Sequence, residues 1–330
     1  MRPPYLTFRR TARISIGLTL LLIIAGIISL AIGSVTIPLS HIARALLGNT
    51  DGIPSSELVI IWQLRLPRII LAIMVGAALA VTGGVFQALF RNPLAEPYIL
   101  GISSGGTVGT LIALVAGTVA LVPAASFLGS LSVMVLVYTI GRRRGQLDTN
   151  VLLLAGVMIG TFFNAIILLL ISLYNQELRS SYLWLLGNLS NADPASLWII
   201  VPVVLAGSCV FWLLGRQFNL IAGGEESAAQ LGVNVPRVKI LSYILASMMI
   251  GIVVSVSGVI GFVGLVIPHI CRILFGPDHR IVFPTSFLIG AIFLLIADLI
   301  ARIVLAPAEI PVGAITAVLG APFFIWLLRK

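Results

Sequence analysis

The stretch RNPLAEPYILGISSGG, residues 91–106, interrupts a chain that is otherwise strongly apolar. It holds two prolines, three glycines, an arginine and a glutamate, and it lies between two long hydrophobic runs. Backbone that leaves the helical conformation inside a bilayer must be buried in protein or line a watery cavity, because lipid offers no hydrogen bonds. Two interpretations are open from these residues alone: an ordinary turn between helices, and the start of a helix that lines a pathway.

The composition of the whole chain places this break in a membrane. The 330 residues are 59% hydrophobic and 9% charged, with a mean hydropathy of +1.14. Apolar runs of about 18 or more residues are typical of transmembrane helices. We therefore expect an all-α polytopic membrane protein with a single transmembrane domain over residues 1–330. About ten helices are predicted, of which the eighth, with Pro268, has the weakest signal: 14–33, 66–90, 98–117, 121–140, 151–173, 196–214, 238–259, 262–275, 281–304 and 310–328.

The distribution of charge predicts how the protein is oriented. Of the 20 lysines and arginines, 15 fall in segments on one side of the predicted membrane and 5 on the other. Cytoplasmic segments carry an excess of Lys and Arg, so both termini are expected in the cytoplasm. The net charge of +9 thus orients the chain, and no nucleic-acid partner is needed to explain it.

A second break, SVSGVIGFVGLVIPHICR at residues 255–272, corresponds to the first. The first break follows the second predicted helix and the second break follows the seventh. Five helices separate these positions, so the two halves, about 1–175 and 176–330, run in opposite directions. Paired Gly/Pro-interrupted segments in inverted halves are a feature of transporters.

The sequence shows no energy source for transport of its own. A P-loop needs glycines followed by Lys and Ser or Thr, but the chain has only two lysines, Lys239 and Lys330, and neither fits. Ion-coupled carriers usually have ionisable groups deep in their helices. Asp298 is the one carboxylate well inside a predicted helix, and Arg302 lies four residues later on the same face. Asp298 is therefore either half of an ion pair within its helix or a proton relay.

The sequence contains few residues or motifs that are typical of enzymes. The three histidines, His41, His269 and His279, are scattered, and no HExxH motif is present. Cys209 and Cys271 have no metal-type spacing. We expect neither a catalytic residue nor a bound metal or cofactor in this chain.

An inner segment, about 215–237, has the features of a docking helix. Gly223 and Gly224 end one helix, and Glu225 and Glu226 open a short second one, with acids at its positive end. Gly232 is a typical stop after such a helix. A small apolar face is expected from Ala228, Ala229 and Leu231. A cleft on another protein could receive this face, and a plain surface connector is the alternative.

Five motifs together resemble the FecCD family, the permease subunits of type II ATP-binding-cassette importers for ferric siderophores, haem and cobalamin. The resemblance covers nearly the whole chain, in order: RLPR (65–68), RNPLAEPYILGISSGG (91–106), GEESAAQLGV (224–233), GFVGLVIPHICR (261–272) and GAPFFIWLL (320–328). It implies a homodimer of ten-helix, lipid-embedded subunits in a bacterial or archaeal cytoplasmic (inner) membrane. Two cytoplasmic ATPase subunits would bind the ATP, and an extracytoplasmic substrate-binding protein would dock outside. An ion-coupled secondary carrier using Asp298 is the alternative function.

The resemblance also implies three groups of site residues. The translocation gate would consist of Asn92, Leu94, Thr149 and Asn150, although Asn150 departs from the small hydroxyl residue expected there. Coupling to the ATPase would involve Gly224, Glu225, Glu226, Ala228, Ala229, Leu231 and Gly232. Basic patches that dock the binding protein would come from Arg65, Arg68 and Arg302. The acidic LAEP variant resembles the cobalamin and haem branches more than the siderophore branch, which favours cobalamin slightly.

Overall fold

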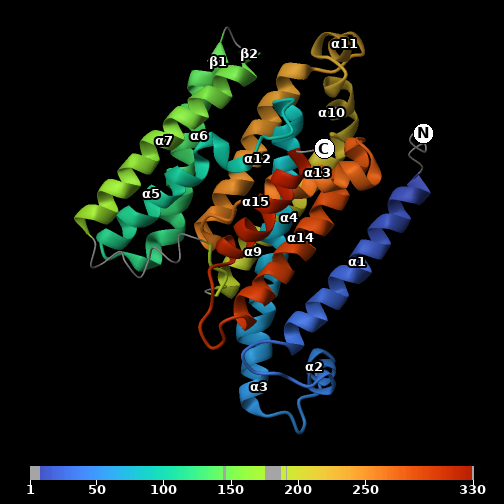
Figure 1. Cartoon of the computed structure of the whole chain (residues 1–330), viewed down its shortest axis with the longest axis vertical. Coiled ribbons are helices and arrows are strands. Elements are labelled where there is room, and N and C mark those ends of the chain that lie inside the picture. The colour runs from blue at the N-terminus through green and yellow to red at the C-terminus, as the bar shows by residue number, and fades with distance from the viewer. Residues whose placement is uncertain (1–7, 144–145, 175–186, 191, 329–330) are drawn as a thin grey trace.

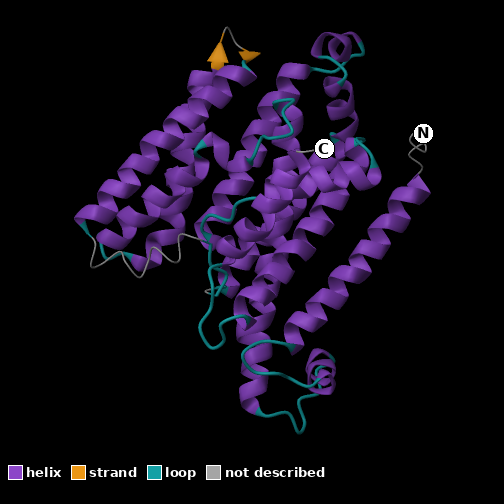
Figure 2. Cartoon of the chain, viewed as in Figure 1, coloured by secondary structure: helices purple, strands orange, loops and turns teal. Residues whose placement is uncertain are grey.

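A computed structural model describes residues 8–143, 146–174, 187–190 and 192–328 (Figure 1). The described chain is a bundle of helices with one short hairpin, in which β1 (Arg142–Arg143) pairs antiparallel with β2 (Gln146–Leu147) (Figure 2). The expectation of an all-α membrane protein is confirmed, and the two-residue strands only close the turn between two helices.

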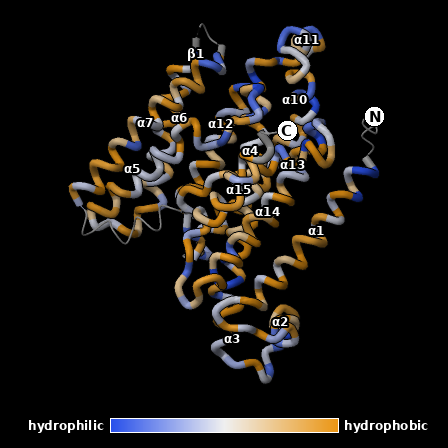
Figure 3. The backbone as a smooth tube through the Cα atoms, in the orientation of Figure 1, coloured by the Kyte–Doolittle hydropathy of each residue, from blue (hydrophilic) through white to orange (hydrophobic). Residues whose placement is uncertain are grey.

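Seven of the described helices are long and apolar enough to cross a membrane, and three shorter apolar helices accompany them. Figure 3 shows that most of their length is hydrophobic. The long helices are α1 (Phe8–Ala31), α4 (Leu66–Leu89), α6 (Val122–Gly141), α7 (Thr149–Leu173), α9 (Pro194–Leu213), α12 (Val235–Ser257) and α14 (His279–Ile303). The shorter ones are α5 (Ile102–Val115), α13 (Val263–Phe275) and α15 (Val312–Leu328). Each corresponds to one of the ten predicted runs.

Small elements occupy the two ends of the bundle. At one end lie α2 (Leu39–Leu46) and α3 (Ser55–Val59), and a π-helical turn, Ile60–Arg65, joins α3 to α4. At the opposite end lie the hairpin, α10 (Gly215–Ala222) and α11 (Glu225–Gln230) (Figure 1). Two 3-10 turns, η2 (Pro97–Leu100) and η3 (Val119–Leu121), precede α5 and α6.

Helix α4 is the centre of the bundle, and nearly all of its residues are buried. Small residues let neighbouring backbones approach it closely. A Cβ atom on Gly76 would lie 2.3 Å from the carbonyl oxygen of Gly290 in α14, and one on Gly83 would lie 2.0 Å from that of Gly264 in α13. The spacing of α4 from α13 and α14 therefore depends on glycine at these positions.

The packing of the two halves is reciprocal. Helices α4 and α12, the second membrane helix of each half, pack against each other. Helix α4 also contacts α13 and α14 of the second half, and α12 contacts the corresponding helices α5 and α6 of the first half. Inverted repeats produce this pattern. The predicted boundary between the halves, at 175–176, falls at the edge of a range outside the described residues.

The glycines of α4 provide a stability test with an internal control. Gly83→Ala should lower the free energy of unfolding by about 1–3 kcal/mol, because the added methyl group meets the backbone of Gly264. Gly84→Ala should be neutral or stabilising by up to about 1 kcal/mol, since its Cβ would meet atoms no nearer than 3.5 Å and alanine favours a helix. Melting temperatures in detergent measure both. Equal shifts for the two variants would show that close approach at Gly83 is not what fixes α13.

Candidate functional site

The first break is an irregular segment between α4 and α5. Arg91 adopts a positive φ of 48°, the 3-10 turn starts at Pro97, and Gly101 is left-handed, with φ 70°. A Cβ on Gly101 would lie 2.9 Å from the backbone of Gly160 in α7, so glycine serves here both for its conformation and for close packing. The predicted helix over 98–117 therefore begins later, at Ile102.

The two breaks bind each other. Glu96 Oε1 accepts a hydrogen bond from the backbone N–H of Phe262 at 2.6 Å, and Tyr98 Oη accepts one from that of Ile260 at 3.1 Å. Residues 258–262 separate α12 from α13, and their amides need acceptors because they lie outside a helix. Glu96 precedes the 3-10 turn of its own segment, but its carboxylate binds at the start of α13, in the opposite half. Side chains of one break thus satisfy the backbone of the other.

Gln87 repairs the defect that Pro268 makes in α13. Proline has no N–H, so the carbonyl of Gly264, four residues earlier, loses its helical donor. Gln87 Nε2 donates to this carbonyl at 3.2 Å and to that of Leu265 at 3.1 Å, and Gln87 Oε1 accepts from Arg272. Gln87 was not predicted as a functional residue, although a polar side chain in an apolar run is a signal for one.

The segment α10–α11 is tied to the start of α14. Asn219 Nδ2 donates to Asp278 Oδ1 at 2.7 Å, and Asn219 Oδ1 accepts from the backbone N–H of His279 at 2.8 Å. Burial alone would raise the pKa of Asp278, but hydrogen bonds from Arg280 and Asn219 outweigh it and hold this pKa at about 2. The carboxylate is therefore ionised at physiological pH, and the attachment of α10 persists.

Helix α11 is also tied to the first break. Glu225 Oε1 lies 2.7 Å from Lys239 Nζ of α12 and 3.7 Å from Arg91 Nη2, and Arg91 also donates to the carbonyl of Ile221 at 3.0 Å. Arg91 is the residue at which α4 turns into the break. Ion pairs therefore connect α11 to both α12 and the irregular segment.

The predicted ends of α11 are confirmed, but one residue of its predicted face is not where we expected it. Gly224 and Gly232 have positive φ angles of 138° and 85° and bound the helix. Ala228 is fully buried and packs with a small cluster that includes Ile221, Val235 and Val238. The free face of this segment instead presents Ala229 and Leu231. Ala228 points the other way because it lies on the side of the helix that packs on α10 and α12.

The predicted gate residues form two separate local turns. Asn92 Oδ1 accepts from the backbone N–H of Leu94 at 2.9 Å, and the Leu94 side chain is half-exposed. Thr149 and Asn150 start α7, where Asp148 Oδ1 caps the helix by accepting from Asn150 N at 3.0 Å. α4 ends and α7 begins on the side of the bundle where α11 lies (Figure 1). A gating role for these residues stays a prediction.

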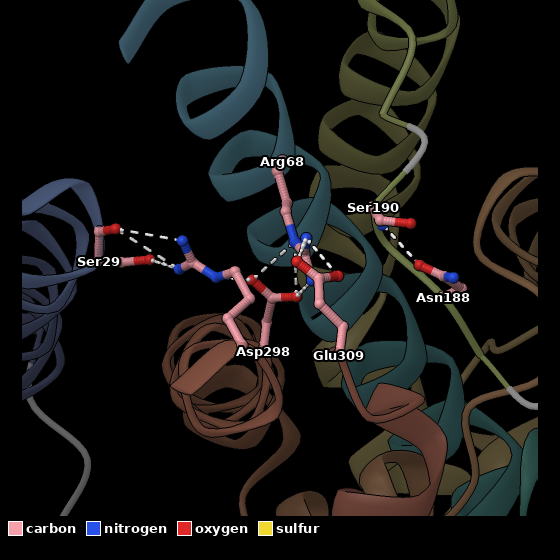
Figure 4. Close-up of polar contacts among 7 residues, drawn as sticks. Ser29, Arg68, Asn188, Ser190, Asp298 and Glu309 are labelled. Atoms are coloured by element: carbon pink, nitrogen blue, oxygen red, sulfur yellow. Dashed lines mark hydrogen bonds and ion pairs between the residues drawn. The ribbon is translucent and has the colours of Figure 1, made fainter. Parts of the chain in front are cut away.

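At the opposite end of the bundle, Asp298 is shared by two arginines (Figure 4). Arg68 Nη2 of α4 lies 2.9 Å from Asp298 Oδ1, and Arg302 Nε lies 3.1 Å from Oδ2. Arg68 Nη1 also donates to both carboxylate oxygens of Glu309, at 3.0 and 2.9 Å. The expected pair of Asp298 with Arg302 is confirmed. Arg68 and Glu309 are further members that could not be predicted, since they come from distant parts of the chain.

Arg65 and Arg302 fix the end of α1. Arg65 Nη1 donates to the carbonyl of Leu30 at 2.5 Å, and its Nη2 donates to that of Val35, which satisfies carbonyls at the end of the helix. Arg302 Nη2 donates to Ser29 Oγ at 2.5 Å.

The predicted docking arginines are buried rather than exposed. Arg65, Arg68 and Arg302 are only 5%, 8% and 6% exposed. All three line a cavity of about 520 Å³, together with Glu309 and Ser190. The structure therefore corrects the expectation of exposed basic patches and places these arginines in a recess. The three arginines carry three positive charges, and Asp298 and Glu309 carry two negative ones. The recess therefore has a net charge of +1.

Apolar helices and two irregular breaks that bond to each other are features of a multi-pass transport permease. The chain belongs to the FecCD transport family, which it matches over residues 21–330. It is a permease subunit of a metal-chelate-type ATP-binding-cassette importer, a class whose permeases lack an ATPase site of their own. This finding favours the importer over the secondary carrier.

Several relatives are similar over most of their length. A cobalamin import permease of Halobacterium salinarum is 43% identical over 84% of this chain and 75% of the relative. A hemin transport permease of Yersinia pestis is 40% identical over 96% of both chains. A vitamin B12 import permease of Klebsiella pneumoniae is 39% identical over 99% of this chain and 96% of the relative. A solved structure, described as an inward-facing conformation of a metal-chelate type transporter, superposes with a TM-score of 0.86 at 33% identity, covering 97% of this chain and 99% of the other.

The shared carboxylate provides a second stability test. Asp298→Asn should destabilise the protein by about 3–5 kcal/mol, because Arg68 and Arg302 would be left buried without their common anion. Glu309→Gln should change stability by about 0–1 kcal/mol, since the Glu309 side chain is 41% exposed. Melting in detergent compares the two. An Asp298→Asn variant as stable as Glu309→Gln would contradict a structural role for the buried pair.

Proposed function

We propose that this chain is the translocation subunit of a homodimeric importer for a cobalamin-type metal chelate, with haem as the second candidate. Two cytoplasmic ATPase subunits bind the ATP and drive the cycle, and an extracytoplasmic binding protein delivers the chelate. The permease spans a bacterial or archaeal cytoplasmic membrane with both termini in the cytoplasm, and it needs no cofactor of its own. The names of the relatives support the substrate class, and the acidic break with Glu96 resembles the cobalamin and haem branches more than the siderophore branch.

The link between α11 and the breaks is the observation that carries this proposal. An ATPase that moved α11 would pull on Arg91 and Lys239 through Glu225. Arg91 starts the first break, and Glu96 and Tyr98 pass its movement to residues 260–262. Both irregular segments would then shift together, which is what opening a pathway between inverted halves requires. Asn92, Leu94, Thr149 and Asn150 would form the inner exit of that pathway.

Reconstitution with the cognate ATPase tests the proposal. Proteoliposomes should take up cobalamin only with ATP, and an inactive ATPase should abolish uptake. Ala229→Asp/Leu231→Asp should weaken ATPase association and uptake at least about tenfold, since charge would replace the exposed apolar contact (about 1.4 kcal/mol per tenfold). Uptake of radiolabelled cobalamin, haemin and a ferric siderophore provides the measurement.

The matched control is Leu47→Asp, which also places a charge on an exposed leucine, at 85% exposure, but at the α2 end of the bundle. Leu47→Asp should leave ATPase association unchanged. Uptake that persists with the inactive ATPase would refute the importer and favour the carrier. Unchanged association in the Ala229→Asp/Leu231→Asp variant would refute docking through α11.

The arginine recess is the proposed docking site for the binding protein. Its net positive charge fits a carboxylate on a protruding loop of that partner. In the free permease, Glu309 already occupies Arg68 Nη1, and its half-exposed side chain can move away. An incoming carboxylate would therefore exchange with Glu309, while Asp298 keeps Arg68 and Arg302 in place.

Removal of the competing carboxylate should strengthen docking. Glu309→Gln should raise the affinity of the binding protein several-fold and accelerate association, because the recess gains one positive charge. Glu57→Gln is the control, as it makes the same charge change at the same end, in the pair with His41. Titrations in nanodiscs across a salt series measure both variants. Equal affinities for Glu309→Gln and Glu57→Gln would exclude exchange at the recess.

A further inference from the structure

A second cavity, separate from the breaks and the arginine recess, lies between α1, α14 and the junction of α9 with α10. Its volume is about 440 Å³, and its wall includes Thr11 and Ser15 of α1, Trp212 of α9, Arg216 of α10 and Arg280 of α14. Figure 1 shows the N-terminal half of α1 standing apart from the bundle at this end. The cavity lies where that separation begins, on the same end of the protein as α11.

The polar side of this cavity is basic and has unused hydrogen-bonding capacity. Arg216 is exposed and makes no hydrogen bond or ion pair to any described residue. Arg280 is oriented by Asp278, 2.6 Å away, and its side chain remains 49% exposed. The buried Thr11 hydroxyl has no partner among the described residues. The site can therefore take an anion that brings its own hydrogen-bond acceptors.

The remaining wall of the cavity is apolar and open. Trp212 and Leu213 of the wall are 44% and 66% exposed, and Ile16, which lies outside the wall one turn after Ala12 on α1, is 61% exposed. The Trp212 ring is held in place, because its Nε1 donates to the carbonyl of Arg280 at 3.2 Å. Exposed apolar side chains on membrane helices are covered by acyl chains or by another protein. The occupant must therefore combine an anionic group with an extended apolar part.

We propose that this cavity binds an anionic phospholipid of the surrounding bilayer. Its phosphate lies against Arg216 and Arg280, where guanidinium groups can donate two hydrogen bonds each. Its acyl chains run along Leu213 and Ile16, in the space between α1 and the bundle. Basic pockets between transmembrane helices on the cytoplasmic side bind such headgroups.

A second copy of the chain fits this position less well than a lipid does. A two-fold contact here would bring the arginines of both copies together, with only Asp278 of each copy to offset them, and like charges in an interface oppose association. A soluble anion would leave the apolar wall uncovered. The lipid bridges α1 to α10 and so fastens the detached half of α1 to the rest of the protein.

The test uses the full-length permease in a neutral detergent. Native mass spectrometry with phosphatidylglycerol should show one tightly retained lipid per chain, with at least fivefold selectivity over phosphatidylcholine. Phosphatidylglycerol should also raise the melting temperature by several degrees. Arg216→Gln should weaken both effects and still fold, because Arg216 has no partner among the described residues to leave behind. Arg216→Gln/Arg280→Gln should lose them completely.

The control is Arg142→Gln/Arg237→Gln, which removes two exposed arginines at the same end but outside the cavity. This control should retain the selective lipid. Equal retention of phosphatidylcholine, or unchanged retention in Arg216→Gln, would overturn the proposal. Equal stabilisation by inorganic phosphate would identify a soluble-anion site instead, and loss of a dimer in Arg216→Gln would identify an interface between copies.

Discussion

The structure depends on the rule that no backbone amide or carbonyl can be left unpaired inside a membrane. Both breaks interrupt helical pairing, and side chains of α4 and of the first break repair the second break and the start of α13. Glu96 and Tyr98 supply acceptors for the amides of Phe262 and Ile260. Gln87 supplies a donor for the carbonyl that Pro268 leaves free. The irregular segments are thus held against each other by a small number of side-chain bonds.

These hydrogen bonds form only if the helices lie very close together, and glycine residues allow that close approach. Gly83 and Gly264 bring α4 and α13 into backbone contact, and Gly264 also packs beneath Pro97 of the first break. Larger residues would separate the helices and put the carbonyl of Gly264 beyond the reach of Gln87. Close packing and polar pairing are therefore two parts of the same construction. Asp298 likewise combines close packing with polar pairing. It is fully buried, and Arg68 and Arg302 neutralise its charge.

Local features of the fold could be predicted from the sequence, because they depend on neighbouring residues. The ten helices followed from apolar runs, and the ends of α11 followed from Gly224 and Gly232. Partners that are distant in the chain could not be found this way. Arg68 and Asp298 are 230 residues apart, and nothing in either segment specifies the other. The burial of Ala228 was missed for a related reason: a six-residue helix of small side chains has no strong periodicity to distinguish its buried side.

The attachment of α1 has a consequence for biosynthesis. Arg65 can satisfy the end of α1 as soon as α4 has been made, but the helix packs on α14, and Ser29 meets Arg302 across 273 residues of sequence. Helix α1 therefore waits for α14 before it has its main native neighbour. During that interval most of its surface faces lipid or the insertion machinery, and Arg68 lies in the membrane before Asp298 has been synthesised. Helix α14 thus joins α1 to the central helix α4 in one late step of assembly.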